Sequence, residues 1–212
     1  ELKLGIIPTV APYLLPLFLT EFASKFPNVK IVVKEMPTAQ IREQLKNRLL
    51  DVGILAIPIE DDELIEYPLF SEPFMVYDCG EKKLPSSVAI EELDYSNLWL
   101  LHEGHCLRTQ VFQICEQSNL NPKANRNFEF ESGSMGSLLN FTKASSGMTI
   151  VPQLAINHLS KKEHKRLVPF SEPVPVRSIG LLTHQHFVKK RLIDELQTIV
   201  KRSVKDLIPS IL

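Results

Sequence analysis

The stretch LKLGIIPTVAPYLLPLFLTEFASKFPNVKIVVKE, residues 2–35, predicts a strand, a helix and a second strand. Leu2 to Pro8 form a short apolar strand, and residues 12–27 form a mostly apolar helix of about four turns that Pro27 ends. Val29 to Glu35 form a β-branched strand. This order predicts neighbouring parallel strands joined by a right-handed crossover.

The alternation of strands and helices continues along the chain. An amphipathic helix over 38–50 and a buried strand over 51–56 complete a βαβαβ unit, and the pattern restarts after residue 78. The later elements are expected as strand 97–101, helix 106–117, strand 127–131, helix 134–145, strand 147–152, strand 176–183 and helix 187–206. The last two return to the first lobe. We therefore expect an α/β fold of two Rossmann-like (periplasmic-binding-protein-like) subdomains with crossover connections, bounded as 1–73 plus 179–212 and 74–178.

Composition and charge exclude several classes of protein. The 212 residues carry 24 Lys and Arg against 25 Asp and Glu, so no strong field draws this piece onto nucleic acid. No apolar run approaches the roughly 18 residues that span a bilayer, so we expect no membrane partner. Three cysteines are an odd number, which favours a reducing, cytoplasmic location over a secreted disulfide framework. The start at Glu1 rather than Met suggests an excised domain.

Side chains that directly follow strands are the first candidates for a binding site. Open α/β sheets bind ligands at the carboxyl ends of their strands, so we expect a cleft there between the two lobes. Thr9 follows the first strand, Thr38 follows the second, and His105 with Cys106 follows the strand 97–101. Helix capping and turn formation are the simpler interpretation of both threonines.

Cys106 has the sequence surroundings of a reactive thiol. It lies beside His105, close to Arg108 and at the expected start of a helix, and each of these features favours the thiolate that attacks a peroxide. Cys115 is nine residues on, which on a helix means opposite faces and roughly 13.5 Å along the axis. The pair can be helical or bonded, but not both. Either the thiols are unrelated, with Cys115 lining an apolar helix face, or the segment has two conformations.

Metal binding is the other interpretation of this segment. His102, His105, Cys106 and Cys115 have the spacing H-x2-H-C-x8-C, which matches no common zinc pattern. We therefore expect no metal and no cofactor. Cys79, at a strand end beside charged residues, is interpreted as incidental.

Three motifs carry a resemblance to a known family. The stretches LGIIPTVAPYLLP (4–16), GHCLRTQVFQIC (104–115) and SSGMTIVP (145–152) together resemble the regulatory domains of the OxyR branch of the LysR-type transcriptional regulators. The glycine-to-proline strand at 147–152 is moderately specific to LysR-type proteins. The segment GHCLR with a second cysteine nine residues on is highly specific to the peroxide-sensing branch.

The resemblance implies a role for each matching residue. Cys106 would be the peroxidatic cysteine and Cys115 the resolving cysteine, joined in a reversible disulfide, and Arg108 would stabilise the thiolate or the developing oxygen anion. Hydrogen peroxide would be held by Thr9, Thr38 and His105. The family often has an acidic residue directly after the arginine, where this chain has Thr109, so a charge partner for Arg108 is in doubt.

The resemblance also implies partners. The disulfide would repack a homodimer or homotetramer and so control antioxidant genes, with DNA bound only through an N-terminal helix-turn-helix domain that this fragment lacks. RNA polymerase would be a further partner, and a glutaredoxin- or thioredoxin-type reductant would reset the switch. Such a domain is not an enzyme. Two alternatives remain: a LysR-type domain for a small organic effector with incidental cysteines, and a thiol peroxidase.

Overall fold

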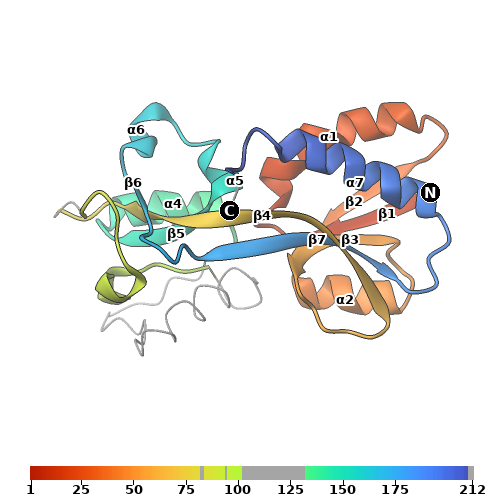
Figure 1. The fold of residues 1–212 in the computed structure, drawn as a ribbon, viewed down its shortest axis with the longest axis horizontal. Coiled ribbons are helices and arrows are strands. Elements are labelled where there is room, and N and C mark those ends of the chain that lie inside the picture. Colours follow the sequence, from red (N-terminus) through yellow and green to blue (C-terminus); the bar gives the residue numbers. More distant parts are fainter. Residues whose placement is uncertain (82–83, 94, 102–131, 210–212) are drawn as a thin grey trace. The chain divides into compact units, whose positions relative to one another are not determined.

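A computed structural model describes residues 1–81, 84–93, 95–101 and 132–209 of the chain. The chain forms two compact units (Figure 1). Unit 1 comprises Glu1–Glu72 and Arg177–Leu212, and unit 2 comprises Pro73–Val176. Each unit therefore has a core of its own, and the chain passes from one to the other at residues 72–73 and 176–177.

The βαβαβ pattern expected at the start of the chain is present in unit 1. Its elements are β1 (Leu2–Ile6), α1 (Ala11–Lys25), β2 (Ile31–Glu35), α2 (Thr38–Lys46) and β3 (Val52–Ile57). Strand β1 lies between β2 and β3 and is parallel to both, with Leu4 opposite Val33 on one side and Val52 on the other. The side chains of β1 and β3 are almost all buried, as their apolar sequences require.

Two later segments complete unit 1. Strand β7 (Val176–His184) pairs antiparallel with β3, so that Leu55 lies opposite Gly180, and β4 (Leu64–Asp78) lies next to β7 in the order of the sheet. A hydrogen bond of 2.8 Å between the Ser71 and Ser178 hydroxyls joins β4 to β7. Helix α7 (Lys190–Val204) packs with α1 on one face of this sheet, and α2 covers the other face (Figure 1).

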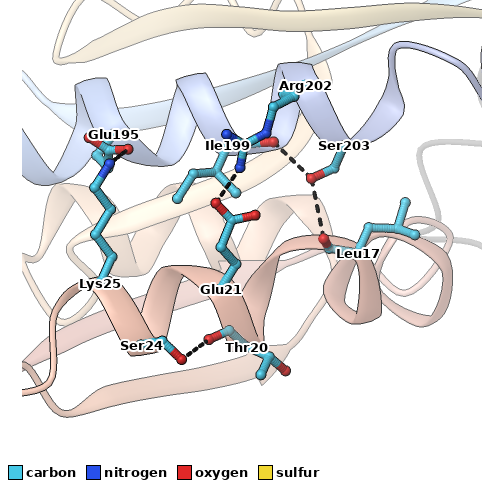
Figure 2. A network of polar contacts seen from close by, with 9 residues as sticks. All are labelled: Leu17, Thr20, Glu21, Ser24, Lys25, Glu195, Ile199, Arg202 and Ser203. Carbon is cyan, nitrogen blue, oxygen red and sulfur yellow. Dashed lines mark hydrogen bonds and ion pairs between the residues drawn. The ribbon is translucent and has the colours of Figure 1, made fainter.

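Helices α1 and α7 are joined by polar contacts along their exposed sides (Figure 2). Lys25 pairs with Glu195, and Glu21 pairs with Arg202. Ser203 Oγ bonds the carbonyl oxygen of Leu17 at 3.2 Å as well as its own helix. Beneath these contacts, the buried stripe of α7, which includes Ile193, Leu196 and Val200, faces the core.

Unit 2 is built around the second half of β4. Strand β5 (Met148–Pro152) and the short β6 (Leu167–Pro169) both pair antiparallel with β4. The described residues of this unit include the helices α4 (Met135–Ala144), α5 (Gln153–Ile156) and α6 (Lys161–His164), and the 3-10 turns η1 (Ile90–Glu92) and η2 (Tyr95–Asn97). Ser134 caps α4, since its hydroxyl accepts a hydrogen bond from the amide of Ser137.

The prediction of a strand over residues 97–101 is wrong. The turn η2 ends at Asn97, and the residues that follow it form isolated bridges in place of a strand, Leu98 with Met148 and Leu101 with Ser132. The expected helix 106–117 and strand 127–131 lie outside the described residues. None of the helices in the described part of the chain is both long and apolar enough to cross a membrane.

Candidate functional site

Thr9 lies in the turn between β1 and α1, where the first strand of unit 1 ends. Only 2% of the residue is exposed. Its hydroxyl oxygen accepts a hydrogen bond from Arg177 Nη1 at 3.2 Å, and its carbonyl oxygen accepts one from Arg177 Nη2 at 3.4 Å. The guanidinium of Arg177 therefore holds both the main chain and the side chain of Thr9.

Arg177 is in turn held by Glu72. Arg177 Nε donates to Glu72 Oε1 at 2.9 Å, and Nη2 lies 2.8 Å from the same oxygen. Both side chains are wholly buried, at 0% exposure. Two charges removed from water are tolerated only when they are paired and hydrogen-bonded, so each residue requires the other. Glu72 and Arg177 are also the residues at which the chain leaves and re-enters unit 1.

This arrangement sets the orientation of the Thr9 hydroxyl. A guanidinium only donates hydrogen bonds, so the oxygen of Thr9 acts as the acceptor toward Arg177 and its proton must point elsewhere. Tyr13, from the first turn of α1, lies near the same guanidinium: burial raises the pKa of the Tyr13 hydroxyl, and the charge of Arg177 partly offsets this. The Tyr13 hydroxyl therefore keeps its proton at neutral pH, as a threonine hydroxyl always does, and both can donate a hydrogen bond.

Thr38 follows β2, the neighbour of β1. The two strands are parallel and end together, since the amide of Met36 donates to the carbonyl of Ile6 at 3.1 Å. Thr9 and Thr38 therefore lie at the same edge of the sheet of unit 1. The expectation that Thr38 caps α2 is wrong: Pro37 is the capping residue, and Thr38 is the first helical residue.

The Thr38 hydroxyl differs from that of Thr9, which Arg177 bonds. Its oxygen is buried and has no hydrogen-bond partner among the described residues. Buried polar atoms are rarely left in this state, because an unsatisfied hydroxyl costs free energy. The Thr38 hydroxyl therefore lies at the carboxyl edge of the parallel strands with no described bond to satisfy it.

The structure does not place the other predicted site residues. His105, Cys106, Arg108 and Cys115 lie outside the described residues, as does His102 of the alternative metal site. Of the predicted ligand-binding residues, the structure brings Thr9 and Thr38 to one edge. Within residues 1–81, 84–93, 95–101 and 132–209, no group of three His, Cys, Asp or Glu side chains could hold a metal ion.

Cys79, the one cysteine that the described residues include, has unreactive surroundings. It comes directly after β4, and only 6% of the residue is exposed. Burial raises the pKa of its thiol, although the neighbouring Arg166 opposes the shift. A raised pKa leaves little thiolate at neutral pH, so Cys79 is a poor nucleophile toward peroxide.

Two residues of the site were not predicted from the sequence. Glu72 lies before the point at residue 78 where the pattern of strands and helices restarts, and Arg177 lies in the expected strand 176–183. The one local signal was a charged residue inside that largely apolar strand. The sequence could not show that Glu72 and Arg177 bond each other, because they are separated by 105 positions.

Comparisons with known proteins agree on one group. Residues 1–204 match the model of the LysR substrate binding domain. The Escherichia coli K12 DNA-binding transcriptional dual regulator OxyR is 34% identical over 183 residues, which cover 85% of this chain and 59% of that protein. The chain thus spans about three fifths of the length of this relative.

Solved structures extend the likeness to the fold. A crystal structure of an OxyR mutant from Porphyromonas gingivalis has a TM-score of 0.87 and 27% identity, and the match covers 99% of this chain and 96% of that one. An H2O2-bound OxyR mutant from Corynebacterium glutamicum has a TM-score of 0.82 and 26% identity, covering 97% of this chain and 65% of that one. These likenesses confirm the expected α/β fold of two periplasmic-binding-protein-like subdomains.

Proposed function

This chain belongs to the LysR substrate-binding domain family, and we propose that it is a regulatory domain that senses hydrogen peroxide. The observation that carries the proposal is the pair of buried threonine hydroxyls at one edge of unit 1. Peroxide is small and uncharged, so only hydrogen bonds can orient it. Thr9 offers a hydroxyl whose direction Arg177 sets, and Thr38 offers one with no partner among the described residues.

The names of the relatives support this ligand. Further relatives, from Haemophilus influenzae (30% identical) and from two other E. coli strains, are named hydrogen peroxide-inducible genes activators, and the C. glutamicum structure is described as H2O2-bound. The relatives are transcription regulators, and the E. coli K12 protein is named as DNA-binding. A role in transcription, in a longer protein, is therefore part of the proposal for this chain.

The proposed chemistry uses two cysteines. The Cys106 thiolate attacks one peroxide oxygen, the O–O bond breaks, and the other oxygen takes up a proton and leaves as water, so that Cys106 becomes a sulfenic acid. The Cys115 thiol then attacks the sulfenic sulfur, forms the disulfide and releases a second water. His105 with Thr9 and Thr38 orients the peroxide, and Arg108 stabilises the negative charge that develops on oxygen.

The proposed output is a change in assembly. A disulfide between Cys106 and Cys115 repacks their segment and alters how subunits of a homodimer or homotetramer meet, which changes the spacing of the attached DNA-binding domains and their contact with RNA polymerase. A glutaredoxin- or thioredoxin-type protein in the cytoplasm reduces the disulfide and resets the switch.

The test is a set of cysteine variants treated with hydrogen peroxide and analysed by intact mass. The unmodified chain should lose two hydrogens, Cys106→Ser should not react, and Cys115→Ser should hold a sulfenic acid that a dimedone-type probe traps. Cys79→Ser is the matched control and should react as the unmodified chain does. A Cys79→Ser variant that loses as much reactivity as Cys106→Ser would refute the assignment.

Intact mass after peroxide tests the first alternative, and peroxide consumption in the presence of a reductant tests the second. A domain for an organic effector with incidental cysteines would show no rapid loss of two hydrogens. A thiol peroxidase would consume peroxide continuously when a reductant is present, whereas a sensor is oxidised once and then reduced slowly.

A further inference from the structure

A cavity of about 140 Å³ lies in unit 1, at the opposite edge of the sheet from Thr9 and Thr38. Its walls come from the segment 48–51, which leads from α2 into β3, and from the segment 184–189, which leads from β7 toward α7. Strand β7 runs antiparallel to β3, so the end of β7 meets the start of β3. The cavity therefore lies at the amino edge of the parallel strands β1 and β3, whereas the two threonines follow the carboxyl ends of β1 and β2.

His184, the last residue of β7, offers a hydrogen-bond donor in the wall of this cavity. Only 9% of the residue is exposed, and its Nδ1 accepts a hydrogen bond from the amide of His186 at 3.1 Å. A neutral imidazole carries one proton, so an Nδ1 that accepts places the proton on Nε2. Among the described residues, Nε2 has no hydrogen-bond partner. This N–H is therefore left for a ligand.

Arg48 lines the same cavity from the end of α2. Its backbone is left-handed, with φ of 56°, a conformation that favours glycine because a side chain crowds the main chain there. Glycine would thus end the helix better, and helix termination does not account for the arginine side chain. The guanidinium makes no hydrogen bond or ion pair with another described residue. Its positive charge at the cavity wall is therefore not neutralised within that part of the chain.

The acidic side chain of the cavity, Asp51, does not offset this charge. Asp51 Oδ2 accepts a hydrogen bond from the amide of Lys3 at 2.8 Å, and Asp51 Oδ1 lies 3.7 Å from Lys189 Nζ. Lys189 also donates to the carbonyl of Glu1 at 2.8 Å. Asp51 and Lys189 therefore balance each other, and the charge of Arg48 remains. With neutral imidazoles, the described lining carries one net positive charge.

The rest of the lining is apolar. Leu50 is 4% exposed, and Phe187 is partly buried. Val188, by contrast, is 84% exposed, so an apolar side chain stands uncovered beside the cavity. A ligand that combines one negative charge with a short hydrocarbon part complements both kinds of surface. The volume suits such a ligand and is too small for a drug-sized molecule.

We propose that this cavity binds the carboxylate of a small monocarboxylic acid. The guanidinium of Arg48 pairs with the carboxylate, His184 Nε2 donates to one of its oxygens, and the hydrocarbon part lies against Phe187 and Val188. This site is separate from the proposed peroxide site and involves neither of its threonines. Its failure would leave the proposed function intact, and the failure of the proposed function would leave this site intact.

The test is a titration of the full, ¹⁵N-labelled chain with sodium butyrate at constant ionic strength, followed by the NMR shifts of the backbone amides. Arg48→Gly removes the guanidinium and suits the left-handed backbone. His184→Asn keeps an acceptor near the position of Nδ1 and removes the Nε2 donor. Lys34→Gln is the matched control, since Lys34 is an exposed cation on β2 of the same unit and does not line the cavity. Butyramide is the uncharged control ligand.

Butyrate should bind saturably at one site, with the largest shifts in residues 48–51 and 184–189. Arg48→Gly should fold with undiminished stability and bind butyrate at least roughly tenfold more weakly, because a charge-assisted pair is lost. His184→Asn should bind roughly fivefold more weakly, and Lys34→Gln should stay within about twofold of the unmodified chain. Butyramide should not saturate the site.

Three results would overturn the inference. They are a lack of saturable butyrate binding by the unmodified chain, equal binding of butyramide, and undiminished binding of butyrate by Arg48→Gly. Inorganic phosphate serves as a further probe, and phosphate that binds more tightly than butyrate would also contradict a carboxylate site. Because Arg48→Gly suits its backbone, the test stays decisive if His184→Asn does not fold.

Discussion

Unit 1 contains ion pairs between the same kinds of charged group in two environments, on the surface and in the interior. The surface pairs, Glu21 with Arg202 and Lys25 with Glu195, join α1 to α7, and the Arg202 and Glu21 side chains are 61% and 49% exposed. The buried pair, Glu72 with Arg177, is not exposed at all. Water and salt screen the surface pairs, so each contributes little, whereas the buried pair must be complete to be tolerated.

The difference explains why only the buried pair bears on the proposed site. A surface pair can be lost and its charges are solvated. The buried pair cannot be solvated, and one of its guanidinium nitrogens donates to the Thr9 hydroxyl. The burial of two charges is thus coupled to the orientation of a proposed ligand-binding residue.

The largest effect should come from breaking the buried pair. Arg177→Met leaves the Glu72 carboxylate without its charged partner and should lower the free energy of unfolding by about 3–5 kcal/mol, measured by urea denaturation. Arg202→Met is the matched control at the surface and should cause no comparable loss. The double variant Arg177→Met with Glu72→Leu should recover much of the stability. Equal losses in the buried and surface variants would contradict the comparison.

A smaller effect is expected at Thr9. Thr9→Val removes the acceptor of Arg177 Nη1 and should cost about 1–3 kcal/mol of unfolding free energy, and it should slow the peroxide reaction as well. Thr9→Ser keeps the hydroxyl and should retain most of both properties. The measurements are urea denaturation and the rate of oxidation by intact mass. If Thr9→Val is as stable and as reactive as the unmodified chain, Arg177 does not act through Thr9.

An intermediate case lies in unit 2, where Lys143 pairs with Glu163 at 2.7 Å. Lys143, assisted by the amide and hydroxyl of Ser160, lowers the pKa of Glu163 to about 2 from an ordinary value of 4.5. Because the folded-state pKa is depressed, the stabilisation is complete above pH 4.5 and is lost as pH falls toward 2. Lys143→Met should therefore lower stability at pH 7 and have a much smaller effect near pH 2, where Glu163 becomes protonated in the folded chain as well. Equal losses at the two pH values would rule out the charge interaction.

The smallest effect on stability is expected at Thr38, and its effect on function should be larger. Thr38→Val removes a buried hydroxyl that has no partner among the described residues, so the free energy of unfolding should stay the same or rise slightly. The rate of oxidation by peroxide should fall roughly tenfold, since a donor to the ligand is lost. An unchanged oxidation rate would remove Thr38 from the proposed site.

The sequence predicted best those elements whose own periodicity determines them. Strands β1, β3 and β5 are apolar runs of ordinary strand length, and helix α7 has a regular apolar stripe. Helix α2 ends at Lys46, earlier than expected, because Arg48 takes a left-handed conformation with φ of 56° and the amides of Leu49 and Leu50 turn back to Gln44. The short strand β6 was missed, since three partly exposed residues carry no periodic signal.

The site was predictable only where it depends on local order. Thr9 and Thr38 were found because each comes directly after a strand, and parallel strands bring their carboxyl ends together. The Glu72–Arg177 pair was missed because its two halves lie on different strands far apart in the chain. The capping role considered for Thr38 was wrong because Pro37, with its extended backbone, takes that position.

The central claim, that hydrogen peroxide is sensed by a specific pair of thiols, is tested most directly by peptide mapping after one equivalent of peroxide. We predict a disulfide-linked peptide containing Cys106 and Cys115, with Cys79 recovered as a free thiol because burial raises its pKa. Three free thiols after this treatment, or a disulfide that includes Cys79, would contradict the claim.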